Sequence, residues 1–285
     1  MRDSKPAGTT GMIRSPAVAG TFYESRPAAL ERDVRSFLPT DAAPGPAFGA
    51  IVPHAGYVYS GPVAGAVYAR IRVPPSVVIL CPNHTGRGMP ASLDPSQAWR
   101  TPLGDVPVDR PLAERLRGLA PSLEWDPAAH VREHSLEVQL PFLQVARPDV
   151  RIVAVCLGAQ DLDLCREVGE ALARLVSGGA EDGDGEDSAP LLLASSDMNH
   201  YESRAVGRRK DERALARIEA IDPEGLFATV LAESISMCGF LPATALLFAA
   251  RAAGRGPVRL VLRRDSGDET GDTQSVVGYA GLIVA

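Results

Sequence analysis

The sequence predicts one α/β domain in which a mostly parallel or mixed central sheet is flanked by helices. Two observations lead to this prediction. Short, continuously apolar segments, typical of strands buried on both faces of a sheet, recur at residues 48–52, 77–81, 152–157 and 191–194. Segments with a helical pattern separate them, and strands alternating with helices are typical of α/β proteins.

The remaining elements follow in chain order. Asp222-Pro223 is a favourable N-cap and first-turn pair, so a helix is expected to run from there to about residue 232. A further helix is expected over 239–252, and strands near 258–263 and 275–284 close the chain. The other expected helices cover residues 27–38, 61–71, 109–119, 134–146, 161–177 and 204–221. The chain shows no internal repeat and no domain linker, which favours a single domain.

Composition excludes several classes of protein. The 285 residues are 45% hydrophobic and 22% charged, which is ordinary for a globular chain and excludes a disordered or disulfide-stapled one. The net charge of −6 argues against a nucleic-acid partner. The most apolar stretch, residues 240–250, is too short to span a bilayer, so no membrane association is expected.

The cysteines and the N-terminus predict a cytoplasmic protein. No secretory signal precedes the domain, and the four cysteines form no C-x-x-C pair, as expected in a reducing compartment. Residues 1–11 are expected to be a flexible tail, with Met12 as an alternative start, and residues 12–285 to be the domain. The acidic, glycine-rich run at 178–189 is expected to be a surface loop.

Three of the five histidines follow buried strands. His54 comes after the first apolar segment, His84 after the second, and His200 after the fourth, with Asp197 in the same loop. Ligands of open α/β sheets bind at the carboxyl ends of the strands, so these imidazoles are expected to converge on one site. Two histidines with one anionic ligand suit iron, copper, zinc or nickel and leave positions open for a substrate.

The pattern leaves two candidates for the anionic ligand. Asp197 lies in the same loop as His200. Cys238 precedes an expected helix, whose N-terminus would lower the pKa of the thiol and favour the metal-binding thiolate. Spacing alone does not choose between them.

A different metal site is also conceivable. His130-Val-Arg-Glu-His134 matches the H-x-x-E-H pattern of inverted zinc metallopeptidases, which needs both histidines on one regular helix. Asp126-Pro127 lies just before the motif, and a helical pattern only begins near Ser135. Whether or not zinc binds there, His134 and Glu137 are expected to line the pocket.

Several motifs, in order from residue 12 to the end, resemble the Memo family, known in bacteria as AmmeMemoRadiSam system protein B. The residues that carry the resemblance are Arg14–Tyr23 (RSPAVAGTFY), Val52–Gly61 (VPHAGYVYSG), Pro82–Gly86 (PNHTG), Glu133–Phe142 (EHSLEVQLPF), Ser195–His200 (SSDMNH), Met237–Gly239 (MCG), Ser266–Asp268 (SGD) and Val277–Tyr279 (VGY). Glu24 departs from the bacterial pattern, which usually has proline there, and so does Phe240, where tyrosine or a polar residue is common.

The resemblance implies a fold similar to the class III (LigB-type) extradiol dioxygenases, which hold non-haem iron with two histidines and a glutamate. It implies that His54 and His84 are the two histidine ligands and that Cys238 replaces the glutamate. It also implies that Asp197 and His200 belong to the pocket, with His200 as a catalytic acid and base. The implied metal is iron or copper.

The expected function is therefore metal-dependent redox chemistry with O₂. His200 would move protons, Asp197 would orient it, and His134 would line the site. The alternative is a non-catalytic binding module that holds a small molecule or a peptide in the same pocket. The family name implies radical-SAM and AMMECR-type proteins as partners.

Overall fold

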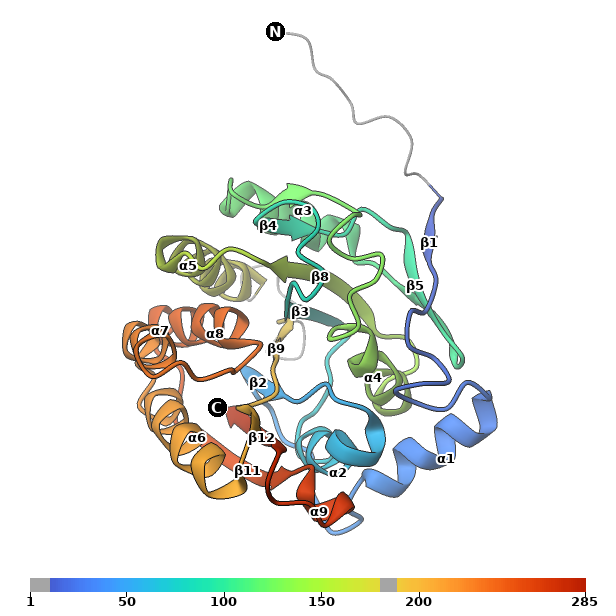
Figure 1. Cartoon of the computed structure of the whole chain (residues 1–285). Coiled ribbons are helices and arrows are strands. Elements are labelled where there is room, and N and C mark those ends of the chain that lie inside the picture. Colours follow the sequence, from blue (N-terminus) through green and yellow to red (C-terminus); the bar gives the residue numbers. More distant parts are fainter. Residues whose placement is uncertain (1–10, 180–188) are drawn as a thin grey trace, which may run out of the picture.

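A mixed sheet forms the centre of the molecule (Figure 1). The computed structural model describes residues 11–179 and 189–285. Within these ranges the sheet has nine strands, in the order β10-β12-β2-β9-β3-β8-β4-β7, with β11 paired to β12. The predicted α/β domain with a mixed sheet flanked by helices is confirmed.

Four parallel strands occupy the middle of the sheet and match the four apolar segments. They are β2 (Gly49–Val52), β9 (Leu191–Ser195), β3 (Ser76–Pro82) and β8 (Arg151–Leu157). Every residue of β2, β3 and β9 is buried, because helices cover both faces of the sheet. Val52 pairs with Ser195, so β2 and β9 end side by side.

Antiparallel strands extend both edges. On one side β12 (Val276–Val284) pairs with β2, β11 (Val258–Asp265) and β10 (His200–Glu202). On the other side β4 (Ala91–Leu93) pairs with β8 and β7 (Glu124–Trp125). A small separate sheet contains β1 (Ile13–Arg14), β5 (Ala98–Thr101) and β6 (Gly104–Pro107). The sequence predicted β11 and β12 but none of these short strands, because two to four residues are too few to show a periodic pattern.

Two sets of helices bury the two faces of the sheet. One apolar cluster joins the sheet to α1 (Pro27–Phe37), α2 (Tyr57–Tyr68) and α4 (Leu140–Ala146). The other joins it to the remaining long helices: α3 (Arg110–Leu119), α5 (Leu162–Gly179), α6 (Arg204–Glu219), α7 (Pro223–Ala232) and α8 (Phe240–Ala252). Along β3, Val78 and Leu80 enter one cluster and Val77 and Ile79 the other, as alternation along a strand requires. A short helix, α9 (Gly267–Thr270), precedes β12.

Two helix boundaries differ from the prediction. Helix α2 begins at Tyr57 rather than at residue 61, with Pro62 inside it. As a proline, this residue has no N–H to donate to the carbonyl of Val58. The helix expected from residue 134 begins with a 3₁₀ turn, η1 (Glu137–Gln139), because residues 130–136 form turns and irregular backbone instead.

Two predicted segments fall largely outside the described residues, namely residues 1–10 of the tail and residues 180–188 of the acidic run. In the part of the chain that the structure describes, no helix is both long enough and apolar enough to cross a membrane.

A buried carboxylate anchors the N-terminal segment. Glu137 is fully buried and forms an ion pair with Arg14. It also accepts hydrogen bonds from the Tyr23 hydroxyl (2.6 Å) and from the backbone N–H groups of Ala17 (2.7 Å) and Val18 (3.1 Å). These bonds hold residues 14–23 against the rest of the domain, and they satisfy a charge that would otherwise be costly to bury.

Replacing Glu137 with alanine should therefore destabilise the protein by about 3 kcal/mol or more, because it leaves the buried Arg14 guanidinium without its counter-charge. Urea unfolding measures this free energy. Glu114→Ala, which removes an exposed partner of Arg110, is the control and should change it by no more than about 0.5 kcal/mol. Equal effects of the two substitutions would contradict the role given to Glu137.

Candidate metal centre

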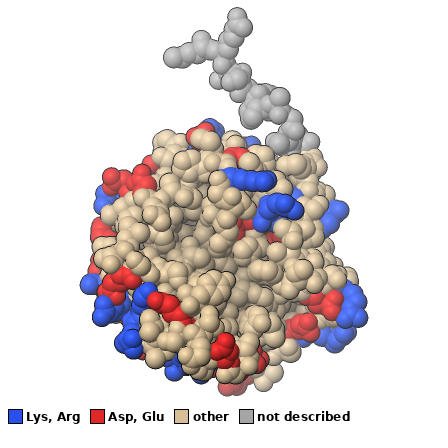
Figure 2. Space-filling model, viewed as in Figure 1, with Lys and Arg blue, Asp and Glu red and all other residues tan. Residues whose placement is uncertain are grey.

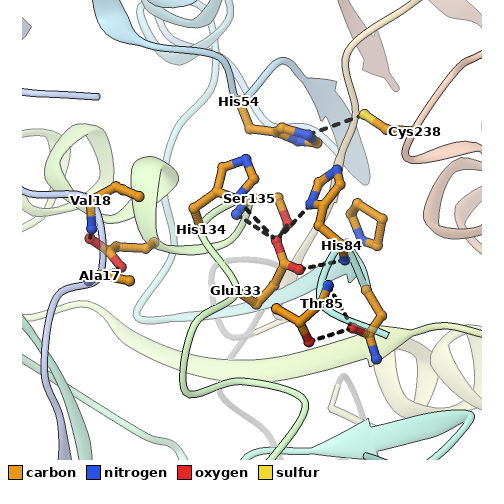
Figure 3. A network of polar contacts seen from close by, with 12 residues as sticks. Ala17, Val18, His54, His84, Thr85, Glu133, His134, Ser135 and Cys238 are labelled. Atoms are coloured by element: carbon orange, nitrogen blue, oxygen red, sulfur yellow. Dashed lines mark hydrogen bonds and ion pairs between the residues drawn. The ribbon is translucent and has the colours of Figure 1, made fainter. Parts of the chain in front are cut away.

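Three side chains of types that can bind a metal meet at the carboxyl ends of the parallel strands. His54 follows β2, His84 follows β3, and Cys238 lies in the loop between α7 and α8. One donor atom from each lies within 4.8 Å of the others. Figure 3 shows His54 facing Cys238, with 3.1 Å between His54 Nε2 and Cys238 Sγ. Donors this close can share one ion at ordinary bond lengths of about 2.0–2.3 Å.

The hydrogen bonds of His54 define which of its ring nitrogens is free. Its Nδ1 lies 2.9 Å from the hydroxyl of Ser195. That hydroxyl has a single proton, which it donates to the carbonyl oxygen of Ser135 (2.6 Å). His54 Nδ1 therefore donates, and Nε2 keeps the lone pair that faces Cys238. Gln139 supports the arrangement by donating to Ser195 Oγ (3.0 Å).

A buried carboxylate orients His84 in the same way. Glu133 is fully buried and accepts bonds from His84 Nδ1 (2.9 Å) and from the His84 backbone N–H (2.7 Å) (Figure 3). Since a carboxylate only accepts, His84 Nδ1 donates and Nε2 is free for a metal. Burial lowers the pKa of His84, but the hydrogen bond and charge of Glu133 outweigh it, so the net shift is upward.

Glu133 is ionised at neutral pH although it is buried. Burial by itself would raise its pKa, but hydrogen bonds from His84 and Ser135 lower it to about 2. Ser135 contributes its backbone N–H (2.9 Å) and its hydroxyl (2.6 Å). Ser135 therefore links the partners of both histidines. It donates to the Glu133 carboxylate, and its carbonyl accepts the hydrogen bond of Ser195, the residue that contacts His54.

Of the two histidines in the H-x-x-E-H motif, one reaches the site. The ring of His134 stacks on His84, with 4.7 Å between centroids, and lies 5.6 Å from that of His54. His130 is buried elsewhere, next to Trp99 and Ser92. Residues 130–134 form a turn and irregular backbone rather than the helix that the peptidase pattern requires, and no potential metal-binding group found among the described residues includes His130. The zinc-peptidase alternative is therefore not supported.

Asp197 and His200 line the same cavity as His54 and His84. The Asp197 carboxylate accepts the His54 backbone N–H (2.7 Å), and burial raises its pKa to about 6. His200 Nδ1 lies 2.8 Å from the carbonyl oxygen of Ser236, which can only accept, so His200 Nε2 is free in the neutral ring. The Ser236 hydroxyl also accepts the His200 backbone N–H (2.7 Å).

The thiol of Cys238 differs from the expectation. Burial, together with the nearby charge of Asp197, raises its pKa well above the usual range, although α8 begins two residues later. Backbone N–H groups, including that of Asp197 at 3.3 Å, oppose this shift without overcoming it. A thiolate here therefore needs a bound cation in place of the proton.

All six candidate residues line one cavity of about 860 Å³, together with residues 20–25 of the anchored N-terminal segment. They are His54, His84, His134, Asp197, His200 and Cys238. Glu137 does not line it. Glu137 contributes to the cavity indirectly, because it accepts a hydrogen bond from Tyr23, which does line it.

Comparison with known proteins identifies the family of the chain. The family model described as Memo-like protein matches residues 14–283. The chain belongs to the Memo family. A MEMO1 family protein of Methanothermobacter thermautotrophicus is 40% identical over 283 residues, covering 95% of this chain and 100% of that one. One of Thermotoga maritima is 39% identical over 288 residues, covering 96% and 100%.

A solved structure confirms the fold of this Memo-family chain. It is an uncharacterized protein, JW3007, of Escherichia coli K12, with a TM-score of 0.51 and 16% sequence identity. The match covers 75% of this chain and 88% of that one. It concerns the fold alone and fits a Memo- or LigB-like architecture.

The sequence does not identify the residues that orient the candidate ligands. Glu133 and Ser195 occur there only as parts of motifs, without a role, and Ser236 belongs to no motif. Ser195 is the last residue of β9, and Ser236 lies two residues before Cys238. Closeness in the sequence to candidate ligands was therefore the signal that could have pointed to these two serines. Their partners are far away in the chain, and only the folded structure shows them.

The Nδ1–H form should predominate at His54, His84 and His200 in the metal-free protein at pH 8, because each Nδ1 faces an acceptor. Nitrogen-15 NMR distinguishes the two neutral forms, and five histidines give few signals to assign. Ser195→Ala should shift the His54 ring toward the Nε2–H form, whereas Ser36→Ala, an exposed control, should not. An Nε2–H form at His54 or His84 in the unmodified protein would contradict the assignment.

The Glu133 carboxylate should make the free energy of unfolding depend on pH. Because its pKa falls from 4.5 to about 2 on folding, its ionised form contributes stability above about pH 4.5. This contribution, roughly 2–3 kcal/mol, is lost as the pH falls toward 2. Urea unfolding of metal-free protein between pH 6 and 3 should show a steeper loss for the unmodified chain than for Glu133→Gln. The control Glu114→Gln should follow the unmodified chain, and parallel profiles for all three would refute the prediction.

Proposed function

We propose that this Memo-family protein holds a redox-active metal, iron or copper, on His54, His84 and Cys238, and supports dioxygenase-like chemistry with O₂. The observation that carries the proposal is the orientation of the two imidazoles. Ser195 and Glu133 each accept a hydrogen bond from an Nδ1–H group, and both Nε2 atoms therefore carry a free lone pair beside a cysteine.

The donor set fits the proposed metals. Two neutral imidazoles and one thiolate are softer than the two histidines and one carboxylate typical of non-haem iron oxygenases. A soft thiolate favours copper(I) and is also found on iron. The raised pKa of the Cys238 thiol means that loading the metal releases a proton, so affinity should rise with pH.

A bound iron or copper ion would supply electron transfer to O₂, and the chain would supply the proton chemistry and the enclosure. His200 Nε2 can take a proton from a substrate while Nδ1 stays on the Ser236 carbonyl. The Asp197 carboxyl has a pKa of about 6, so most of it is ionised at neutral pH. Its negative charge can then balance a positive charge that develops at His200. The ring of His134 covers His84 and excludes water from that side.

A second candidate is a non-catalytic binding module for a small molecule or a peptide. The exposed apolar side chains of Val58 (59%) and Tyr201 (77%) at the rim of the cavity favour it, because such residues often mark binding surfaces. The radical-SAM and AMMECR-type partners implied by the family name are candidates for that role.

Metal content of protein purified without oxygen tests the site. Unmodified protein should hold about one iron or copper per chain, and His54→Ala and Cys238→Ser should each lower this at least about tenfold. His130→Ala, which alters a buried histidine outside the cavity, should retain the metal. Unchanged metal content in His54→Ala would refute the site.

Oxygen consumption by the metal-loaded protein separates the two candidate functions. Turnover with catechols or thiols that is lost in His200→Ala, with metal content unchanged, supports the enzyme. Stoichiometric metal without O₂ consumption, in the presence and absence of the implied partners, supports the binding module.

A further inference from the structure

Tyrosines are concentrated around the cavity. The chain has six tyrosines, and five of them line this one pocket although it involves only a small part of the chain. They are Tyr23, Tyr57, Tyr59, Tyr201 and Tyr279. The sixth, Tyr68, does not line it and donates to Gln139 (3.0 Å). A concentration of this kind indicates that the cavity uses aromatic rings or phenol hydroxyls.

Only two of the five hydroxyls are used by the fold. Tyr23 donates to Glu137, and Tyr57 donates to the carbonyl oxygen of Val138 (2.6 Å). Within residues 11–179 and 189–285, the hydroxyls of Tyr59, Tyr201 and Tyr279 form no hydrogen bond. These three side chains remain available to a ligand.

The three available tyrosines share the cavity with Asp197. Burial raises the pKa of Tyr279, and the charge of Asp197 raises it further. Three phenol groups and one carboxylate therefore line the same cavity.

Tyr201 is unusual in both its backbone and its exposure. Its φ of 61° lies in the left-handed region, which a bulky side chain rarely adopts and which costs about 1–3 kcal/mol. Its side chain is nevertheless 77% exposed, with its ring 5.6 Å from that of His200. Packing of the Tyr201 side chain therefore does little to offset its backbone strain. The residue nevertheless lies at the mouth of the cavity, beside the candidate site.

The charges around the cavity are negative. Glu24, Asp33 and Asp197 line it, but none of its described lining residues is an arginine or a lysine, although the chain has 29 of them. Arg26 pairs with Glu24 (2.6 Å) but does not line the cavity. Figure 2 shows the charged side chains mostly around the periphery of the face, with other residues in its middle. Apart from a bound metal and the imidazoles of its four histidines, the cavity offers nothing to balance an anionic ligand.

We infer that the cavity accepts a cationic amine that carries an aromatic or apolar body. The tyrosine rings attract an ammonium group and pack against the body, the free hydroxyls accept its N–H bonds, and Asp197 with the rim acids Glu24 and Asp33 balances its charge. This ligand class rests on the proposed role of the cavity as the substrate site of a metal centre. It excludes carboxylates and phosphates as preferred ligands.

Three phenols of similar size but different charge test the inference. They are tyramine, which is cationic at pH 7, 4-ethylphenol, which is neutral, and 3-(4-hydroxyphenyl)propionate, which is anionic. Calorimetric titration of metal-loaded and of metal-free protein should give tyramine at least about tenfold tighter binding than the anion, with the neutral phenol between them. Equal affinities, a preference for the anion, or no binding of tyramine at millimolar concentration would overturn the inference.

Matched variants show whether the named groups are responsible. Glu24→Gln combined with Asp33→Asn should weaken tyramine binding roughly threefold to tenfold and leave 4-ethylphenol unchanged. Tyr201→Ala should weaken the binding of both. Asp163→Asn, at an 85% exposed carboxylate on α5, is the control and should change neither. Unaltered tyramine binding in the double variant would contradict the charge basis.

The inference and the proposed function fail separately. Metal content and O₂ consumption report on the proposed function, whereas the order of the three affinities reports on the ligand class. Stoichiometric metal with no preference for the cation would refute the ligand class alone. A preference for the cation without metal binding would refute the proposed function and leave the charge selectivity of the cavity standing.

Discussion

The parallel pairing of β2, β9 and β3 is the constraint on which the candidate site depends. Val52 pairs with Ser195 and Leu80 with Ala194, so these strands end at one edge of the sheet and the loops that follow them leave from neighbouring points. His54, His84 and Asp197 come from segments far apart in the chain and meet there for this reason alone. The loop before α8 then brings Cys238 to the same place. Burial of the strands on both faces makes this edge rigid, and a rigid edge is what a preorganised metal site requires.

One short segment holds this arrangement together. Within residues 133–139, Glu133 orients His84, the Ser135 carbonyl accepts the hydrogen bond of the Ser195 hydroxyl, and Glu137 anchors the N-terminal wall of the cavity. Gln139 completes the arrangement by donating to Ser195. The segment begins with the last two residues of the H-x-x-E-H motif, but its acidic residues act as hydrogen-bond acceptors behind the cavity. Its irregular backbone explains this, because turns let neighbouring residues point in different directions, as a helix would not.

The sequence predicted the parts of the fold that depend on burial. Continuous apolar runs located β2, β3, β8 and β9, and the strand-end rule correctly brought His54, His84 and His200 to one cavity. The sequence did not predict β4 to β7, because two to four residues are too few to show a periodic hydrophobic pattern. It also did not predict that the helix after His134 begins several residues later than expected. It also could not identify Glu133 or Ser195 as partners of the histidines, because pairs such as Ser195 and His54 are 141 residues apart and only tertiary structure joins them. The gathering of five tyrosines is equally invisible in the sequence, since their positions run from residue 23 to residue 279. The choice between Asp197 and Cys238 as the anionic ligand came from the family resemblance, and the geometry keeps both beside His54.

In the proposed site, His54, His84 and Cys238 together bind one metal ion. X-ray absorption spectroscopy of the loaded protein measures the ligand atoms directly. The structure predicts two imidazole nitrogens at about 2.0–2.1 Å and one sulfur at about 2.3 Å, with the sulfur lost in Cys238→Ser. A first shell of nitrogen and oxygen without sulfur in the unmodified protein would contradict the claim.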